Sequence, residues 1–436
     1  MKMMRIDQVC EVNPSKTIDL DPNTTISFVP MDSVSTAGHI NLDKTISVEK
    51  VKNYSVFRNG DIIFAKITPC MENGKGAIAT GLKEGYAAGS TEFIVLRPNT
   101  DIIQREWLYL FLAQKSFRLY CQQHTTGSAG QKRVPPKFLS ACEMPIPSLE
   151  KQHKIVSRIE ELSSNLDEAV RTLQETKQQL AVYRQAVLKE AFIGKLTVKW
   201  RESTLPVNAD EIIARIKVDY KTVGTHKMME ALDLPVIPNT WRWVSIGDIS
   251  TGVEYGTSKK SMKSGDVPVL RMGNIQNSSI DWTDLVYTSD QDEIHKYMLH
   301  YGDVLFNRTN SSEWVGKTAP FMDKRKALFA GYLIRINQIS EINPKYLAFY
   351  LNSETARKYG NKVKTDGVNQ SNINSKKLYS YPFPLCSRQE QDMIVNKLEN
   401  RLSVCNSIEK IVDDSLVQAE ALRQSILKKA FEGRLV

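Results

Sequence analysis

Apolar and small residues recur along two long stretches of the chain at alternating intervals of four and three positions. This spacing is typical of a coiled-coil seam, in which one stripe of a helix faces another helix. The first stretch follows Pro145 and Pro147 and ends at Gly194, and the second ends at Gly433, as helices commonly end at glycine. About 40 residues at 1.5 Å each make a helix roughly 60 Å long. The seam positions of the first stretch are Ile155, Ile159, Leu162, Leu166, Ala169, Leu173, Thr176, Leu180, Tyr183 and Val187.

The second stretch lies 239 positions later and carries a weaker seam. Its positions are Ile394, Leu398, Arg401, Cys405, Ile408, Val412, Ser415, Ala419, Leu422 and Ile426. Arg401 and Ser415 suit a seam poorly, so we expect the helix to use Leu402 and Leu416 instead. The two helices are predicted to pair with each other in antiparallel orientation. The alternative is that each packs on an external partner.

Both stretches belong to a tandem repeat with a period near 240 residues. Arg184–Leu196 matches Arg423–Leu435 at 8 of 13 positions, and Asn59–Lys66 matches Tyr301–Arg308. Further matches follow in the same order along both halves. The chain therefore contains two copies of one structural unit.

Ahead of each long helix, short β-type runs alternate with helical stretches between Gly, Pro, Asn and Ser. The β-type runs are Asp61–Ile67, Glu92–Leu96, Asp303–Asn307 and Leu328–Ile336, and the helical stretches are Gln104–Gln122 and Pro344–Gly360. We therefore predict an α+β fold: two tandem mixed α/β domains separated by two long helices that form an antiparallel coiled coil, with pseudo-two-fold symmetry. The expected boundaries are 1–150 for the first mixed domain, 151–196 for the first long helix, 197–239 for a linker with one short amphipathic run, 240–386 for the second mixed domain and 387–436 for the second long helix.

Composition narrows the class of protein. Of 436 residues, 41% are hydrophobic and 25% charged, as in globular proteins. No apolar stretch is long enough to cross a membrane and no secretory signal is visible, so we expect a cytoplasmic protein without a membrane partner. The six cysteines have no paired or metal-binding spacing, which favours free thiols in a reducing compartment. A net charge of +9 permits an anionic partner.

Motifs for catalysis are missing. Gly316-Lys317-Thr318 resembles the end of a P-loop, but Ser311 stands where the first glycine is required. Asn73-Gly74-Lys75-Gly76 predicts a tight turn, with a phosphate contact as the alternative. No hydrolase, zinc-protease or amino-methyltransferase motif is present. We therefore predict no catalytic residue, no metal and no cofactor of the chain's own.

Polar and basic loops occur at equivalent places just before each long helix. Asn and Gln can pair with adenine edges, and Lys and Arg with guanine or phosphates. A shared scaffold with different loop tips suits two readers of different DNA sequences. In the first copy the candidates in this loop, 122–133, are Gln122, Gln123, Thr125, Thr126, Ser128, Gln131, Lys132 and Arg133, and further candidates outside it are Lys66 and Lys75. In the second copy the candidates in the loop, 362–372, are Lys362, Lys364, Thr365, Asn369, Gln370 and Asn372, and further candidates outside it are Lys259, Lys260, Arg271, Asn274, Asn307, Arg308 and Asn310. Arg271, Asn274 and Arg308 are equally suited to brace the fold.

Taken together, these motifs resemble the specificity subunit of Type I restriction-modification systems, over essentially the whole chain. The segments that carry the resemblance are Asn59–Lys75, Gly89–Phe93, Thr126–Gly130, Val269–Asn274, Gly302–Arg308 and the two Leu-Lys-x-Ala-Phe-x-Gly-Lys/Arg-Leu helix ends. The resemblance implies two target-recognition domains, each reading half of a split site in double-stranded DNA. It implies that the long helices act as a spacer and as the docking surface for two methyltransferase (modification) subunits.

The resemblance also places the chemistry on other subunits. The modification subunits would carry S-adenosylmethionine and methylate adenine. Restriction subunits, which translocate and cleave DNA, would use ATP and Mg²⁺. This chain would then be non-catalytic, in keeping with its lack of methyltransferase and ATPase motifs.

Two other classes of function remain open from the residues alone. One is a single-chain restriction or methylation enzyme fused to recognition domains. The other is a coiled-coil adaptor without a DNA role. Methylation by the purified chain would identify the first, and a gel shift at low salt would separate the second.

Overall fold

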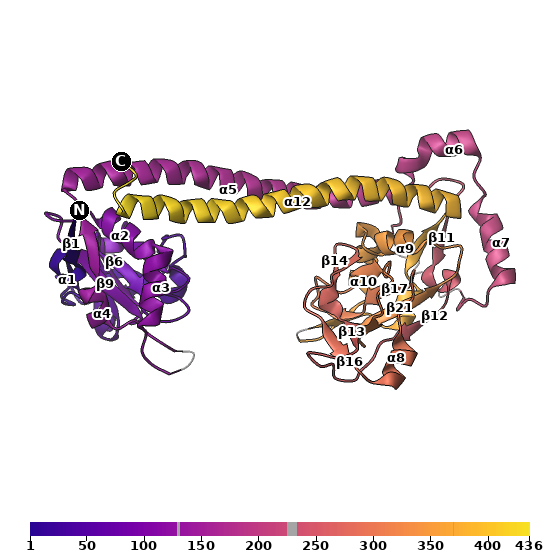
Figure 1. Cartoon of the computed structure of the whole chain (residues 1–436), viewed down its shortest axis with the longest axis horizontal. Helices are drawn as coiled ribbons and strands as arrows, with labels where there is room; N and C mark the ends of the chain where they lie inside the picture. The colour runs from indigo at the N-terminus through magenta and orange to yellow at the C-terminus, as the bar shows by residue number, and fades with distance from the viewer. Residues whose placement is uncertain (129–130, 225–232, 369) are drawn as a thin grey trace. The chain divides into compact units, whose positions relative to one another are not determined.

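The computed structural model describes residues 1–128, 131–224, 233–368 and 370–436. It divides into two compact units: unit one is Met1–Glu175 with Val412–Val436, and unit two is Thr176–Ile411. Each unit combines helices with small sheets (Figure 1), which confirms the predicted α+β class with two tandem mixed domains. Within the described ranges, no helix is long and apolar enough to cross a membrane.

Unit one contains two four-stranded sheets and one two-stranded pair. In the first sheet, β6 lies between β9 and β7, with Ile62 opposite Leu96 and Ile78. In the second, β3 and β8 are parallel neighbours. The first sheet has the order β2 (Cys10–Val12), β9 (Phe93–Pro98), β6 (Ile62–Ala65), β7 (Gly76–Ile78); the second has the order β4 (Thr45–Ser47), β3 (Thr25–Val29), β8 (Tyr86–Gly89), β5 (Ser55–Arg58); the pair is β1 (Lys2–Arg5) with β10 (Glu143–Ile146).

Unit two repeats this plan. Its β17 lies between β21 and β19, and β13 and β20 are parallel neighbours. The four-stranded sheet has the order β12 (Ser250–Tyr255), β21 (Leu333–Gln338), β17 (Val304–Asn307), β19 (Thr318–Pro320); a three-stranded sheet has the order β16 (Val286–Thr288), β13 (Val267–Leu270), β20 (Leu328–Phe329); the two-stranded pairs are β11 (Arg242–Ser245) with β24 (Pro382–Leu385) and β14 (Ile275–Gln276) with β15 (Ser279–Ile280). The matching strand orders confirm the sequence repeat at the level of topology.

Helices cover these sheets. Unit one has α1 (Ile6–Val9), α2 (Arg105–Ala113), α3 (Lys115–Gln123) and α4 (Pro136–Ala141). Unit two has α6 (Val198–Thr204), α7 (Ala209–Asp219), α8 (Gln291–Tyr297), α9 (Pro344–Leu351), α10 (Glu354–Val363) and α11 (Ser375–Tyr379). Short 3-10 turns are η1 (Met31–Ser33), η2 (Val48–Asn53), η3 (Lys83–Gly85), η4 (Lys195–Thr197), η5 (Ile246–Ile249) and η6 (Met272–Asn274).

The two predicted long helices are α5 (Leu149–Phe192) and α12 (Arg388–Phe431), each of 44 residues. Each is followed within two residues by a glycine with positive φ, Gly194 at +73° and Gly433 at +74°. A residue with a Cβ rarely adopts this left-handed conformation, so the glycine ends the helix.

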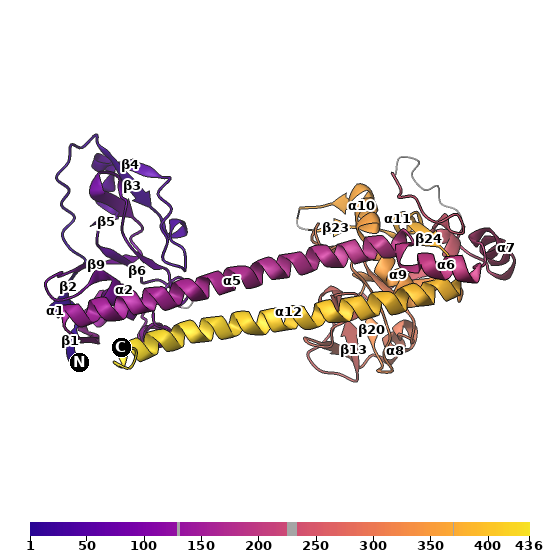
Figure 2. The same ribbon diagram turned by 90° about the horizontal axis from the view of Figure 1, so that it is seen from above.

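Segments of the two helices lie side by side in antiparallel orientation within each unit (Figures 1 and 2). In unit one, Arg423 near the end of α12 pairs with Asp167 of α5. In unit two, Arg184 pairs with Glu409 at 3.0 Å, whereas Glu190, further along α5, pairs with Arg401 at 3.3 Å. The partner numbers fall as the α5 numbers rise, which confirms the antiparallel prediction.

The seam predicted for α12 is correct at every second position and wrong at the positions between them. Leu402 is buried in place of Arg401, as predicted, but Ile408 and Leu422 are exposed. The buried positions Leu398, Leu402 and Cys405 follow intervals of four and then three, the reverse of the expected order. Further along this stripe, buried Val412 and Ala419 and half-buried Leu416 lie between Glu409 and Arg423. Glu409 and Arg423 form ion pairs with α5 at positions that a purely apolar seam would fill.

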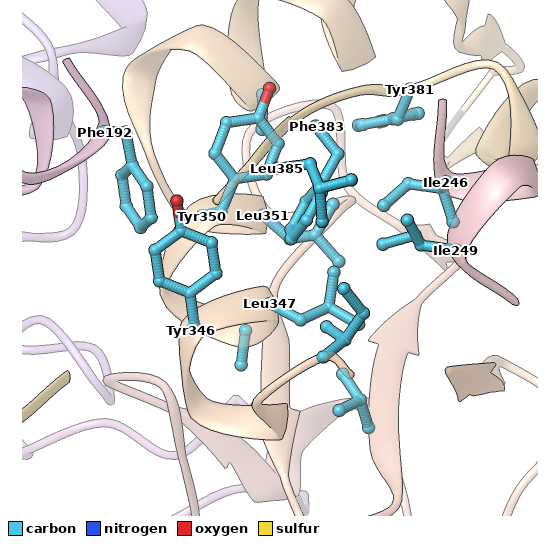
Figure 3. Packing of buried hydrophobic residues seen from close by; sticks show 14 of the residues in the cluster. Phe192, Ile246, Ile249, Tyr346, Leu347, Tyr350, Leu351, Tyr381, Phe383 and Leu385 are labelled. Atoms are coloured by element: carbon cyan, nitrogen blue, oxygen red, sulfur yellow. The ribbon is translucent and has the colours of Figure 1, made fainter. Parts of the chain in front are cut away.

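The end of a long helix completes each core. In unit one, the ring of Phe431 from α12 lies 4.2 Å from that of Trp107 and 5.5 Å from that of Phe111. In unit two, the ring of Phe192 from α5 lies 5.2 Å from those of both Tyr346 and Tyr350 (Figure 3). Each mixed domain therefore packs against the start of one long helix and the end of the other.

A buried glutamine ties each domain to the helix that starts there. The Gln152 side chain accepts a hydrogen bond from the backbone N–H of Gln104 at 2.8 Å and donates to the carbonyls of Ile102 and Pro147 at 3.0 and 2.9 Å. Gln391, 239 positions later, makes the equivalent three bonds in unit two. Both side chains are fully buried, so their amides satisfy backbone groups that water cannot reach.

Replacing Gln152 with alanine is expected to destabilise unit one by about 1–3 kcal/mol, because buried backbone groups lose their partners. Hydrogen exchange of the α2 amides during a urea titration measures this loss. Lys151→Ala is the matched control, since Lys151 is its exposed neighbour on the same helix. Equal stability of the two variants would contradict a bracing role for Gln152.

The predicted linker is partly packed into unit two. The amphipathic run forms α7, whose Ile212 and Ile216 are buried in the core. Buried Glu390 at the start of α12 accepts hydrogen bonds from Arg201 and Trp241 at 2.7 and 2.9 Å. The linker is therefore fastened to the domain that follows it.

Candidate nucleic-acid interface

In unit one, the segment that follows β6 pairs with two short stretches of the loop between α3 and α4. Arg133 lies opposite both Ile67 and Thr126. The backbone N–H of Val134 donates to the carbonyl of Lys66 at 2.9 Å, and that of Arg133 donates to Thr126 at 2.8 Å. The first ladder, as we call this arrangement, consists of 66–68, 126 and 132–134.

Unit two forms the same arrangement after β17. Here β18 (Thr309–Asn310) pairs with β23 (Ser371–Asn372), which pairs with β22 (Thr365–Asp366). The backbone N–H of Ile373 donates to the carbonyl of Arg308 at 2.9 Å, as Val134 does to Lys66. The second ladder consists of 308–310, 365–366 and 371–373.

Both ladders are anchored at equivalent points of the sheets. The backbone N–H of Lys66 donates to the carbonyl of Glu92 at 2.9 Å, and that of Arg308 donates to Tyr332 at 3.0 Å. Each acceptor lies just before the strand that pairs with β6 or β17. The sequence repeat thus places two loops with different side chains at equivalent positions of the same backbone scaffold.

The first ladder carries a braced arginine. Arg133 Nε and Nη2 donate to the Glu92 carboxylate at 2.9 and 3.0 Å, and Nη1 donates to the carbonyl of Gln131 at 3.0 Å. The hydrogen bond from Arg133 is the main cause that lowers the pKa of the Glu92 carboxyl. The pair is therefore fully charged at neutral pH.

Arg308 on the second ladder is held by other means. Its guanidinium carbon lies 4.7 Å above the centre of the Tyr255 ring, a cation–π contact. Its Nη2 donates to the Asn372 side-chain oxygen at 3.3 Å, and the Asn372 amide donates to the Thr309 hydroxyl at 2.7 Å. At 3.3 Å the hydrogen bond to Asn372 is long, so the stacking contact with Tyr255 is the main restraint on the guanidinium.

Most of the remaining predicted loop residues lie around the two ladders with exposed side chains. In unit one these are Gln122, Gln123, Thr126, Ser128, Gln131 and Lys132, with Thr125 and Lys66 half-buried. In unit two they are Lys362, Thr365 and Gln370, with Asn310 and Asn372 half-buried. Lys364 is engaged: its Nζ donates to the Ser312 hydroxyl and to Asn361. Asn369 lies outside the described residues.

Other predicted residues lie away from the ladders or serve the scaffold. Asn274 is buried and donates to the carbonyls of Asp281 and Thr283 at 3.0 and 3.1 Å. Arg271 pairs with Asp284 at 2.9 Å, so the bracing alternative describes both residues. Asn307 precedes the second ladder but is fully buried.

Three predicted lysines also differ in setting. Lys75 donates to the carbonyl of Met31 at 3.0 Å, and Gly74 beside it has φ +79°, which matches the turn interpretation. Lys259 pairs with Asp290 at 2.7 Å. Lys260 is exposed.

The motif 316–318 forms part of a loop and strand. Lys317 lies 4.0 Å above the Trp314 ring and donates to Gln276 at 3.0 Å, and Thr318 begins β19. A P-loop would require a helix at this point. In the part of the chain that the structure describes, no group of three or more His, Cys, Asp and Glu side chains could hold a metal ion.

Sequence reasoning missed Glu92 and Tyr255. Glu92 lies within Gly89–Phe93, a segment that the resemblance singled out as a motif, so a signal was present. Tyr255 lies at the end of β12, more than 50 residues before Arg308, and only the sheet brings the two together.

The chain matches the family described as Type I restriction modification DNA specificity domain, at residues 1–178 and 238–416. Among its relatives is the Type I restriction enzyme EcoAI specificity subunit of Escherichia coli, 28% identical over 93% of this chain and 78% of the relative. The EcoEI specificity subunit of Escherichia coli is 26% identical over 92% and 78%.

Two solved structures share the fold. One, from work on complex assembly and conformational transition of the type I R-M system, covers 100% of this chain and 98% of its own, with a TM-score of 0.73 and 20% identity. The HsdS subunit from Thermoanaerobacter tengcongensis covers 100% and 97%, with a TM-score of 0.51 and 21% identity. Two family matches spanning both copies of the repeat, one for each ladder, show that this chain belongs to the Type I restriction modification DNA specificity family.

Proposed function

We propose that this chain is the non-catalytic subunit that reads a two-part site in double-stranded DNA, with each ladder reading one half. The observation that carries the proposal is the pair of equivalent ladders with different side chains. A shared backbone fixes where each loop stands, and the side chains decide which bases it accepts.

The exposed chemistry of each ladder suits base edges and phosphates. In unit one, Gln131 and Lys132 are exposed next to Arg133. In unit two, Thr365 is exposed on β22, and Gln370 is exposed just before β23. Amides can pair bidentately with adenine, and cations with guanine or phosphate. Two different sets of readers therefore favour two different half-sites.

Modification subunits would dock on the long helices. In unit two, α12 exposes Val404, Ile408 and Ile411, which are spaced by four and three residues and so share one face. This apolar stripe lies beside the face of α12 that contacts α5, and a helix of a partner subunit could pack against it. Two modification subunits with S-adenosylmethionine, and restriction subunits with ATP and Mg²⁺, would supply the chemistry. 

We place this assembly in the cytoplasm. All six cysteines are free thiols in the structure, and five of them are buried. Burial raises the pKa of the Cys10 and Cys121 thiols to about 12, so they stay protonated and unreactive. Free thiols are typical of a reducing compartment.

DNA binding is expected to depend on the partner subunits. A chain of net charge +9 with two small ladders makes few phosphate contacts, so binding by the chain alone should be weak and should weaken further as salt is added. Modification subunits would add phosphate contacts and tighten binding. Titration of a labelled duplex at two salt concentrations, with and without those subunits, measures the difference. Equal affinity in both cases would refute the dependence.

The purified chain alone is expected to transfer no methyl group. Incubation with radiolabelled S-adenosylmethionine and DNA carrying the site measures this directly, and the chain with its modification subunits is the positive control. Methylation by the chain alone would show it to be a single-chain enzyme.

A further inference from the structure

Each ladder carries one guanidinium whose direction is fixed by neighbouring groups. The hydrogen bonds that Arg133 donates to Glu92 and Gln131 use Nε–H and one hydrogen on each terminal nitrogen. Arginine has five N–H groups, so one hydrogen remains on each terminal nitrogen. The Arg133 side chain is 39% exposed, which leaves this remaining edge within reach of a partner molecule.

Arg308 is the arginine of the second ladder, and it comes from a different segment than Arg133 does in the first. Arg133 belongs to the segment that leads into α4, whereas Arg308 belongs to the segment that follows β17. Within their ladders, Lys66 stands at the position of Arg308, and Asn372 stands at that of Arg133. Each ladder therefore presents one guanidinium, although the two arginines do not stand at equivalent positions of the repeat.

The braces also differ. Glu92 holds Arg133 with a two-point carboxylate contact, and the Tyr255 ring holds Arg308 by stacking. No carboxylate forms an ion pair with Arg308 among the residues that the structure describes. The two units thus hold an arginine in a fixed orientation by two different kinds of contact. This indicates that the oriented guanidinium serves the same function in both units.

We propose that Arg133 and Arg308 each read a guanine in their own half-site, and that Glu92 and Tyr255 are the positioning residues that aim them. The inference rests on the proposed function and specifies one base pair of each half-site. A guanidinium edge with two parallel donors matches the O6 and N7 acceptors of guanine in the major groove. A side chain that is already held in place loses less conformational entropy on binding, so the free energy of binding to the correct base is more favourable.

The experiment uses cells that carry the complete restriction-modification system, and it reads all methylated sites by sequencing. For the wild-type chain, each half-site is expected to contain a required G·C pair. Arg133→Lys keeps the positive charge but loses the planar fork, so discrimination at one base pair of the first half-site should fall about tenfold or more. If Arg133 only contacts a phosphate, lysine would retain the wild-type site, and this result would overturn the assignment.

Glu92→Gln tests the brace without touching the reader. Glutamine keeps the shape of the side chain but loses the charge, and we expect relaxed reading at the same base pair that Arg133→Lys affects. Glu150→Gln is the matched control, since Glu150 forms an exposed ion pair with Lys154 on α5, away from the ladder. A site list for Glu92→Gln identical to that of the control would refute the positioning role.

Tyr255 offers its own matched pair of variants. Tyr255→Phe keeps the ring under Arg308 and loses only the hydroxyl, which accepts a hydrogen bond from the backbone N–H of Ser375 at 3.1 Å. Tyr255→Leu removes the ring. We expect relaxed reading at one base pair of the second half-site for leucine and the wild-type site for phenylalanine. Equal relaxation in both variants would show that the hydroxyl, and not the stacking contact, matters.

The outcomes separate this inference from the proposed function. If the wild-type chain directs methylation to a two-part site that has no G·C requirement in either half, the guanine assignment fails and the proposed function stands. If each half-site does not follow its own unit, the proposed function itself fails.

Discussion

Replacing residues 1–150 by the equivalent domain of a relative should change one half of the methylated DNA site and leave the other half as it is. The first ladder, with Arg133 and its exposed neighbours, lies wholly within the exchanged segment. The second ladder lies in a unit with its own core and strand pairing. Sequencing of methylated sites in cells that carry the exchanged chain and its partner subunits measures the outcome.

The structure indicates how such an exchange must be built. The donor domain has to keep the aromatic pair that receives Phe431, namely Trp107 and Phe111, and the loop at Ile102 and Gln104 that Gln152 braces. A control exchange restricted to residues 122–133 should produce the same change of half-site if the ladder loop alone reads DNA. Changes in both halves of the site would contradict independent reading.

Lengthening both long helices by four residues is expected to lengthen the spacer between the half-sites. Four residues add about 6 Å of helix, and duplex DNA rises about 3.4 Å per base pair, so the spacer should grow by one or two pairs. The insertions belong after Glu175 in α5 and after Leu416 in α12, midway between the ion pairs Asp167–Arg423 and Arg184–Glu409. Four residues nearly preserve the 3.5-residue repeat of the seam.

Activity should also fall, because each added base pair rotates the second half-site by about a tenth of a turn. The control is the same insertion in α5 alone, which shifts the ion pairs of one helix against the other and should give an unstable protein. The measurement is again the list of methylated sites. An unchanged spacer at normal activity would show that the helices do not set the distance.

Where the fold follows from short-range pattern, the sequence predicted it well. The repeat, the two helices and their glycine ends need only periodicity and local backbone preference. The register of α12 was missed at Ile408 because apolarity alone cannot rank two neighbouring stripes of a helix. Glu409, a charged residue, lies on the chosen stripe because Arg184 on the other helix neutralises it.

The ladders could be predicted only as loops, since their pairing joins segments far apart in the chain. Arg133 meets Glu92, and Arg308 meets Tyr255, through sheets whose order a single sequence does not reveal. For the same reason, residue type alone did not distinguish Arg271 and Asn274, which brace loops, from exposed readers such as Gln131. Many of the candidates on the ladders lie in the loops that recur before each long helix, where the repeat marked equivalent positions. Lys66 and Arg308 lie instead in the segments after β6 and β17.

The helix ends that complete the two cores also set an order of events on the ribosome. Phe192 is made before Tyr346 and Tyr350, so the second unit, Thr176–Ile411, has all its parts once residue 411 has emerged. Trp107 of the first unit waits for Phe431, more than 300 residues later. Domains usually finish folding in the order of their synthesis. In this protein the domain translated second is therefore complete first, and the Trp107 and Phe111 rings of the nascent first domain stay without their Phe431 contact until the end of α12 has been made.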